Sequence, residues 1–314
     1  MAPKIVCVVG PTACGKTTLG VLLAKRFNGE VVSADSMQIY RGMTIGTAAP
    51  TAEEMDGGPH HMIAGADPAE QWSAARYAQA ATACVEDILT RGKLPILVGG
   101  TGLWLDAVVK GHGFAGGHAE GAVRRSLQQR LEAEGIEPLL AQLREVDPES
   151  AQKLHPADEK RILRALEVYL ETGKTITAHN AETKALPPRY DAIWIGLQFA
   201  DREDMKALID RRVDVMVEEG LLDEVNGLLA SGLPRGATAL QAIGYKEFLG
   251  VLDGTATVEE AIAEVKLRSR QYAKRQLTWL RRNPAILWIF WEKQRDFARA
   301  LQVSTEILTA GGVS

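Results

Sequence analysis

GPTACGKT, residues 10–17, is the stretch of sequence that decides the fold. It matches the pattern GxxxxGK[ST], in which glycines let backbone N–H groups curl around a phosphate while a lysine and a hydroxyl complete the cradle. A β-branched run at residues 4–9 precedes it, and a helical spacing of leucines begins after Gly15. This strand–loop–helix setting predicts binding of a diphosphate or triphosphate. A chance match in a tight turn is the alternative.

Strand-like and helical segments alternate along the rest of the chain. Apolar runs predict strands at residues 30–33, 94–98, 192–199 and 286–291, and longer patterns predict helices at 69–91 and 257–282. This order predicts an α/β fold, a P-loop nucleoside-triphosphate-hydrolase-like parallel sheet flanked by helices. Residues 111–121 are rich in Gly and His, and residues 122–156 are charged and helical without a strand. We therefore expect a small helical insertion, 114–156, between two core segments, 1–113 and 157–314.

The composition is that of a globular protein with balanced charge. The 314 residues include 36 Lys and Arg and 40 Asp and Glu, a net charge of −4, which argues against a protein coated in positive charge but allows a local basic stripe. The three cysteines form no CxxC pair, which argues against a disulfide framework and a structural zinc. No apolar run approaches the ~20 residues that span a bilayer, and no leader precedes the first strand. We therefore expect a cytoplasmic protein with no membrane partner, acting as a monomer.

The usual acidic partner of such a cradle is missing from its usual place. The run at 94–98 continues into Gly99-Gly100-Thr101-Gly102 without a carboxylate. The first acidic residue after a strand is Asp35, which belongs at the same carboxyl edge of the sheet as the cradle. There it can act as a general base on a nucleophile approaching bound phosphates, or it can cap a helix.

Six segments together resemble the tRNA dimethylallyltransferase family. They are GPTACGKT (10–17), DSMQIYRGMTIGTAAPT (35–51), PHHM (59–62), LVGGTGLWLDAVVKG (97–111), QAIGYKEF (241–248) and RSRQYAKRQLTW (268–279). The resemblance implies transfer of a dimethylallyl group from dimethylallyl diphosphate to the exocyclic amine of the adenine 3′ of the anticodon in tRNA. Diphosphate would be released. It also implies a fold related to nucleotide kinases with a helical insertion.

The resemblance assigns roles to residues at matching positions. Those it makes catalytic are Asp35 as general base, Thr101, Lys16 and Arg212. Those it gives to the diphosphate are Gly10, Pro11, Thr12, Ala13, Cys14, Gly15, Lys16, Thr17, Arg161 and Arg164. The Thr17 hydroxyl is the expected ligand of the one expected cofactor, Mg²⁺. Two alternatives stay open: Thr101 can be a helix N-cap, and Arg161 with Arg164 can be an exposed helix face.

The resemblance also implies a tRNA surface on four segments. Its residues are Asp35, Ser36, Met37 and Gln38; Lys160, Arg161, Ile162, Leu163 and Arg164; Gln241, Gly244, Tyr245 and Lys246; and Arg270, Lys274 and Arg275. Ser36, Met37 and Gln38 would line the site of a flipped-out adenine, with the Gln38 amide facing its polar edge. Separately, the basic segment, residues 266–282, carries seven positive charges and no acidic residue. Such a helix repels itself unless phosphates neutralise it, and a solvated basic face is the alternative.

Three rival functions stay open at this point. A small-molecule kinase would share the cradle and use the insertion as a lid, and an isopentenyltransferase of free adenylate would share the donor. A non-catalytic RNA-binding protein could also keep the loop. The adjacent His60 and His61 suggest a metal site, but no third ligand is spaced to join them, so we expect them to be structural or to support the residues of a neighbouring site.

Overall fold

The computed structural model describes residues 2–111, 114 and 121–313. The chain forms two compact units, one made of Met1–Gly111 with Arg189–Ser314 and the other of His112–Pro188. The insertion was predicted to start at residue 114. Most residues near this boundary, 112–113 and 115–120, lie outside the described ones.

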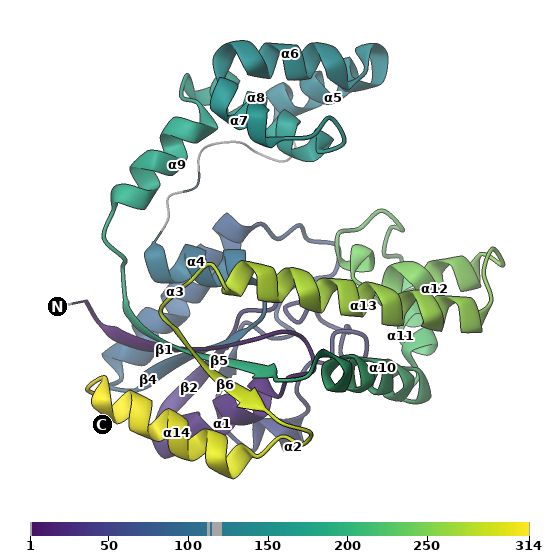
Figure 1. The fold of residues 1–314 in the computed structure, drawn as a ribbon. Helices are drawn as coiled ribbons and strands as arrows, with labels where there is room; N and C mark the ends of the chain where they lie inside the picture. The colour runs from purple at the N-terminus through teal and green to yellow at the C-terminus, as the bar shows by residue number, and fades with distance from the viewer. Residues whose placement is uncertain (1, 112–113, 115–120, 314) are drawn as a thin grey trace. The chain divides into compact units, whose positions relative to one another are not determined.

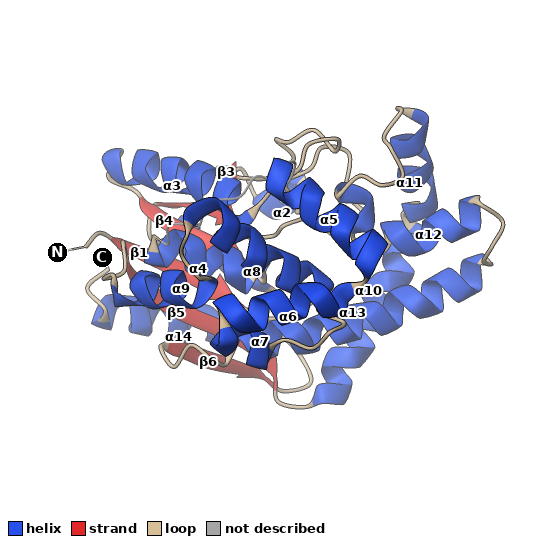
Figure 2. Ribbon diagram, turned by 90° about the horizontal axis from the view of Figure 1, so that it is seen from above, coloured by secondary structure: helices blue, strands red, loops and turns tan. Residues whose placement is uncertain are grey.

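A single parallel sheet of six strands, in the order β3-β2-β4-β1-β5-β6, forms the centre of the larger unit (Figures 1 and 2). The strands are β1 (Lys4–Val9), β2 (Gly29–Ser33), β3 (His60–His61), β4 (Leu94–Gly99), β5 (Asp191–Phe199) and β6 (Ile286–Trp291). Each pairing between them is parallel. The predicted α/β fold is confirmed, and both late apolar runs join the sheet as expected.

Helices cover both faces of this sheet. The central strand β1 shows why, because its side chains are apolar on both sides and each side needs a covering layer. Its Val6 and Val8 pack with helices α1 (Lys16–Arg26) and α14 (Phe297–Ala310). Its Cys7 and Val9 pack in the core that includes α3 (Ala74–Thr90) and α4 (Gly102–Lys110). The other helices of this unit are α2 (Ala52–Met55), α10 (Arg202–Glu218), α11 (Leu221–Ala230), α12 (Tyr245–Leu252) and α13 (Val258–Leu280), with a 3-10 turn at Ala239–Gln241. Alternate residues of one strand thus build two cores.

Two local predictions differ from the structure. The helix predicted at 69–91 begins only at Ala74, because the Ser73 hydroxyl caps it by accepting from the backbone N–H of Arg76. The strand β3 was not predicted, since two residues are too few to show an alternating pattern. His60 and His61 pair with β2, and the His61 ring lies 2.7 Å from a Glu30 carboxylate oxygen.

The smaller unit consists of helices α5 (Ala122–Glu134), α6 (Ile136–Val146), α7 (Pro148–Lys153), α8 (Glu159–Thr172) and α9 (Ile176–Ala185). Its core joins Leu127 and Leu143 to Ile162 and Leu166 of α8. The predicted end of the insertion at 156 is therefore wrong, because the unit continues to Pro188. An amphipathic helix shows the same pattern whichever core it joins, so the sequence of α8 could not assign it. No helix of the described chain is long and apolar enough to cross a membrane.

Candidate active site

The phosphate loop follows β1 and is shaped by residues with positive φ. Gly10 has φ 153°, and a Cβ there would lie 2.3 Å from the Leu197 carbonyl oxygen, so only glycine fits. Ala13 and Gly15 have φ 64° and 88°. Alternation of left- and right-handed backbone turns successive N–H groups to one side, and α1 starts directly after Gly15. The predicted cradle is thus a tight loop that leads directly into a helix N-terminus, the kind of place where backbone N–H groups and the helix dipole favour an anion.

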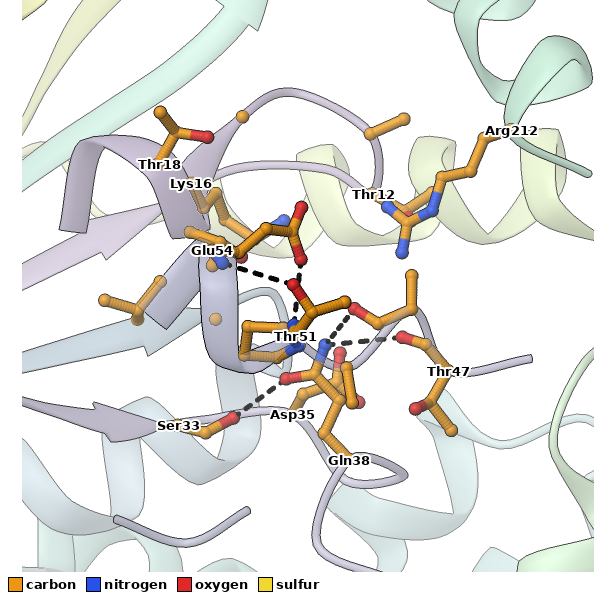
Figure 3. A pocket seen from close by; sticks show the side chains of 18 of the residues that line it. Thr12, Lys16, Thr18, Ser33, Asp35, Gln38, Thr47, Thr51, Glu54 and Arg212 are labelled. Atoms are coloured by element: carbon orange, nitrogen blue, oxygen red, sulfur yellow. Dashed lines mark hydrogen bonds between the residues drawn. The ribbon is translucent and has the colours of Figure 1, made fainter. Parts of the chain in front are cut away.

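Side chains span and anchor this loop. The Lys16 ammonium donates to the Pro11 carbonyl oxygen at 2.7 Å, within the loop. The N–H of Thr12 donates to the Gln276 side-chain oxygen at 2.9 Å, and its hydroxyl accepts from the Arg212 guanidinium at 3.3 Å. Figure 3 shows Arg212 reaching toward Thr12. The loop is therefore held by residues from two distant helices, α13 and α10.

Cys14 takes part in the loop through its backbone. Its side chain is completely buried, and burial raises the pKa of the thiol above its ordinary value. Its carbonyl oxygen accepts from the Trp291 indole N–H at 2.8 Å. Cys14 is thus a packed neutral side chain and not a nucleophile.

Two cavities meet at this loop. The larger, of about 760 Å³, is lined by the loop residues Gly15 to Thr18 and by Ser33 and Arg295, among others. The smaller, of about 280 Å³, is lined among others by Ser36, Met37 and Tyr272. The residues common to both linings are Thr12, Ala13, Asp35, Thr47, Arg212 and Met216. Asp35 and Arg212 therefore lie where the two cavities meet.

The carboxyl ends of three adjacent strands bring the predicted catalytic groups together. The cradle follows β1, Asp35 follows β2, and Thr101 follows β4, which lies between them. The Thr101 hydroxyl accepts from the N–H of Ser36 at 3.3 Å, so the two segments touch. Thr101 occupies the N-cap position of α4 but makes no capping bond with its side chain. Asp35 uses one oxygen locally, accepting from the N–H of Met37 at 2.9 Å.

The charge of Asp35 affects the pKa values of two neighbouring side chains. Burial lowers the pKa of the Arg212 guanidinium, while attraction to Asp35 opposes that change. Arginine remains protonated at neutral pH even so. Burial, and then the Asp35 carboxylate, raise the pKa of Tyr272 to about 12. The site thus combines a carboxylate, a guanidinium and a neutral phenol.

The Gln38 side chain makes three hydrogen bonds within the protein. Its amide nitrogen donates to the carbonyl oxygens of Thr47 and Ala48, at 3.3 and 3.0 Å, and its oxygen accepts from the Ser33 hydroxyl at 3.1 Å (Figure 3). Both amide hydrogens are therefore used within the protein. That Gln38 faces the polar edge of an adenine stays a prediction. Gln38 fixes the loop that walls the larger cavity.

Three residues of the predicted tRNA surface have buried side chains. Ile162 and Leu163 lie in the core of the smaller unit, and Tyr245 is completely buried in the larger one. Buried side chains cannot contact an RNA, so these predictions are wrong for the side chains. Their neighbours Lys160, Arg161, Gln241 and Lys246 are exposed, whereas Gly244 is buried with φ 99°.

Tyr245 and Glu224 form an anchor for the loop after Asp35. The Tyr245 hydroxyl donates to the Glu224 carboxylate, which also accepts from the N–H groups of Thr44, Ile45 and Gly46 at 2.8 to 3.1 Å. Burial alone raises the pKa of Glu224, but the hydrogen bonds from Ile45 and Tyr245 outweigh it and lower the pKa. The carboxylate is thus held charged, and it fixes the cavity wall.

Removing the Tyr245 hydroxyl is expected to destabilise the protein. Tyr245→Phe leaves a half-buried carboxylate without one donor, at a cost of about 1 kcal/mol in the free energy of unfolding. Urea denaturation measures it. Tyr40→Phe is the matched control, because that hydroxyl donates at 3.2 Å to a neutral carbonyl oxygen, that of Glu70. A loss for Tyr245→Phe no larger than for Tyr40→Phe would contradict the role of the charged acceptor.

The basic segment is partly neutralised by the protein itself. Lys266 pairs with Asp214 at 2.5 Å, Arg268 with Glu264 at 2.6 Å, and Arg270 with Asp210 at 2.7 Å. The expectation that all seven charges need an outside polyanion is therefore wrong, and Arg270 acts in an internal ion pair. The remaining cations are Lys274, Arg275, Arg281 and Arg282. Lys274 and Arg275 are exposed, and Arg275 lies over the Tyr272 ring, 5.7 Å from its centre.

Arg161 and Arg164 were predicted to contact the diphosphate. Both lie on α8 of the smaller unit, whereas the phosphate loop belongs to the larger. Arg164 pairs with the buried Glu167 at 2.8 Å, and Arg161 is exposed. Their role at the diphosphate stays a prediction.

The residues around Thr17 fit a magnesium ion that is bound by the protein and by the oxygen atoms of a diphosphate. Thr17 lines the larger cavity and offers a hydroxyl oxygen, the kind of ligand atom that Mg²⁺ prefers. Across the described residues, no group of three or more His, Cys, Asp or Glu could hold a metal by itself. Water and phosphate oxygens would complete such a shell, as is usual for Mg²⁺ in phosphate sites.

Sequence reasoning did not single out Gln276 and Tyr272. Both lie on α13 within the segment RSRQYAKRQLTW, between basic residues that drew attention first. The available signal was their helical spacing of four, which places them on one face of the helix.

Known proteins are similar to this chain over nearly its whole length. The model of a family described as IPP transferase matches residues 38–283. A tRNA dimethylallyltransferase of Caldanaerobacter subterraneus subsp. tengcongensis is 47% identical over 298 residues, 95% of each chain. The crystal structure of the full-length tRNA isopentenylpyrophosphate transferase from Bacillus halodurans has a TM-score of 0.74 at 43% identity, covering 98% of this chain and 96% of that one. A structure titled as a eukaryotic dimethylallyltransferase acting on tRNA has a TM-score of 0.84 at 31% identity, covering 98% and 80%.

Proposed function

We propose, from the premise that this chain belongs to the IPP transferase family of tRNA dimethylallyltransferases, that its two linked cavities are where tRNA is prenylated. The chain is accordingly a prenyltransferase that moves a dimethylallyl group onto tRNA. In finer detail, the donor is dimethylallyl diphosphate and the acceptor is the exocyclic amine of the adenine 3′ of the anticodon. The convergence of the cradle, Asp35 and Thr101 at one sheet edge carries this proposal.

The larger cavity takes the donor. An allylic diphosphate ionises readily once its leaving group is stabilised, so donors aimed at the departing charge are the main requirement. The N–H groups at the start of α1 and the Lys16 ammonium supply them, and Arg212 adds a cation at the junction of the cavities. The bond from the allylic carbon to oxygen breaks, and its electron pair leaves with the diphosphate. Bound Mg²⁺, with Thr17 as a ligand, would add positive charge to that leaving group.

The smaller cavity takes the adenine, flipped out of the anticodon loop. Ser36 and Met37 line it beside Asp35. The amine nitrogen bonds to the allylic carbon, and the Asp35 carboxylate accepts the proton that the amine loses. The Thr101 hydroxyl accepts from the N–H of Ser36, and this hydrogen bond fixes the wall of the cavity relative to the turn after β4. Flipping costs a few kcal/mol, which contacts to the base and the backbone must offset.

A monomer in the cytoplasm is part of the proposal. The residues that line the two cavities all belong to the larger unit of one chain, so a second copy is not needed to complete them. Sedimentation of the protein with and without tRNA tests the monomer.

The exposed cations of the basic segment are expected to bind tRNA phosphates. Replacing Lys274 and Arg275 by Gln should weaken tRNA binding and lower the slope of log K against log salt concentration by about 2, one for each lost phosphate contact. Filter binding over a salt series measures both. The matched control replaces the adjacent pair Lys25 and Arg26 on α1 by Gln, and should leave the slope unchanged. Equal slopes for both doubles would make this helix a solvated basic face.

The proposed reaction is tested by supplying each donor with each acceptor. The purified protein and Mg²⁺ are incubated with unmodified tRNA or AMP, and with dimethylallyl diphosphate or ATP, and the products are weighed by mass spectrometry. We expect an adenosine heavier by one dimethylallyl group only in tRNA and only with the prenyl donor. Prenylated AMP would favour the free-adenylate enzyme, and phosphate transfer from ATP to a small acceptor would favour the kinase.

A further inference from the structure

We infer that Gln276 is a positioning residue of the diphosphate cradle, an inference that rests on the proposed function. Gln276 lies on α13, 264 residues from Thr12 in the sequence, yet its side-chain oxygen accepts the Thr12 N–H at 2.9 Å. The side chain is only 5% exposed, in a helix whose neighbouring residues 274 and 275 are exposed. Buried polar groups are generally hydrogen-bonded, and the partner of this buried amide oxygen is the phosphate loop.

The amide of Gln276 lies between the phosphate loop and the turn that carries Thr101. A Cβ at Gly100 would lie 2.1 Å from the Gln276 amide nitrogen and 3.1 Å from the Gly10 carbonyl oxygen, so the absence of a side chain at Gly100 is what admits Gln276. Gly100 directly precedes Thr101 in this turn. The side chain of Gln276 therefore contacts both the phosphate loop, at Thr12, and the turn after β4, at Gly100.

Thr12 is also held from its other side. Its hydroxyl accepts from Arg212 of α10, and α10 is joined to α13 by the ion pair of Asp210 with Arg270. Both the backbone and the side chain of Thr12 are thus tied to the helical layer that carries the basic segment. Because the Thr12 N–H is already used, the diphosphate binds the other N–H groups of the loop. The contact to Gln276 lets the loop keep one shape before the diphosphate arrives, which lowers the entropic cost of binding.

The inference is tested with inorganic diphosphate and Mg²⁺ as the probe. Gln276→Met keeps the size of the side chain and removes the acceptor. We expect its Kd for diphosphate and its KM for dimethylallyl diphosphate to rise about tenfold, equivalent to about 1.4 kcal/mol. The KM for tRNA should stay within about twofold. Hydrogen exchange of the Thr12 amide should become faster, because its bond is lost. Gln276→Asn is one methylene shorter, which moves the amide oxygen away from the Thr12 N–H. This variant is used if the methionine variant does not fold.

Gln271→Met is the matched control, the same exchange at an exposed position of the same helix. Its diphosphate affinity should equal that of the wild type. The inference is overturned if a folded Gln276→Met protein keeps wild-type diphosphate affinity and Thr12 exchange. It is overturned equally if affinities for diphosphate and tRNA fall together with the melting temperature, the pattern of general destabilisation. A wild-type protein that binds no diphosphate would instead refute the proposed function.

Discussion

Asp35→Asn is expected to lower the rate of prenyl transfer about 100- to 10,000-fold, the range that general-base catalysis contributes. The asparagine oxygen can still accept from the N–H of Met37, as one oxygen of Asp35 does, so the local turn is retained. What is lost is the group that accepts the proton of the amine at the junction of the two cavities. Single-turnover kinetics measure the rate, and filter binding shows whether tRNA affinity is kept.

Asp67→Asn is the matched control for this change. One Asp67 oxygen accepts from the N–H of Ala69 at 2.9 Å, the same two-residue turn, but Asp67 lines neither cavity. Its rate should equal that of the wild type. A near-full rate for Asp35→Asn would show that Asp35 serves only its turn and that another group, or water, takes the proton.

Lys16→Met is expected to lower kcat about 100- to 1,000-fold, as removal of one preorganised charge from a site of developing negative charge does. The Lys16 ammonium lies within the loop, held by the Pro11 carbonyl oxygen, where a bound diphosphate would need it. The charge on the leaving group grows as the carbon–oxygen bond breaks, so the loss should fall more on kcat than on donor KM. Steady-state kinetics with varied donor separate the two.

Lys25→Met, on the same helix and half-exposed, is the control and should change neither constant. If Lys16→Met raised KM alone, Lys16 would bind the ground-state diphosphate and contribute nothing specific to bond breaking. The Lys16→Met variant retains the backbone donors of the loop, so binding of the diphosphate itself should persist.

The sequence by itself determined the elements that depend on local order. The phosphate loop needs glycine at Gly10 because the chain there has positive φ and lies against β5, and the pattern around it names strand, loop and helix at once. Asp35 and Thr101 could be placed at the same edge as the loop, because parallel strands present their carboxyl ends together. The resemblance carried by six ordered segments added the family.

The tertiary structure alone decided which side chains are available. Tyr245, Ile162 and Leu163 lie in segments that resemble tRNA contacts, yet packing buries them. Three cations of the basic segment pair with carboxylates, of which Asp210 and Asp214 lie on α10, far away in the sequence. Gln276 meets Thr12 only because α13, 264 residues further along the chain, packs against the loop that follows β1. Local patterns report the period of an element, but burial, ion pairing and hydrogen-bond partners depend on contacts between distant residues, which no local pattern contains.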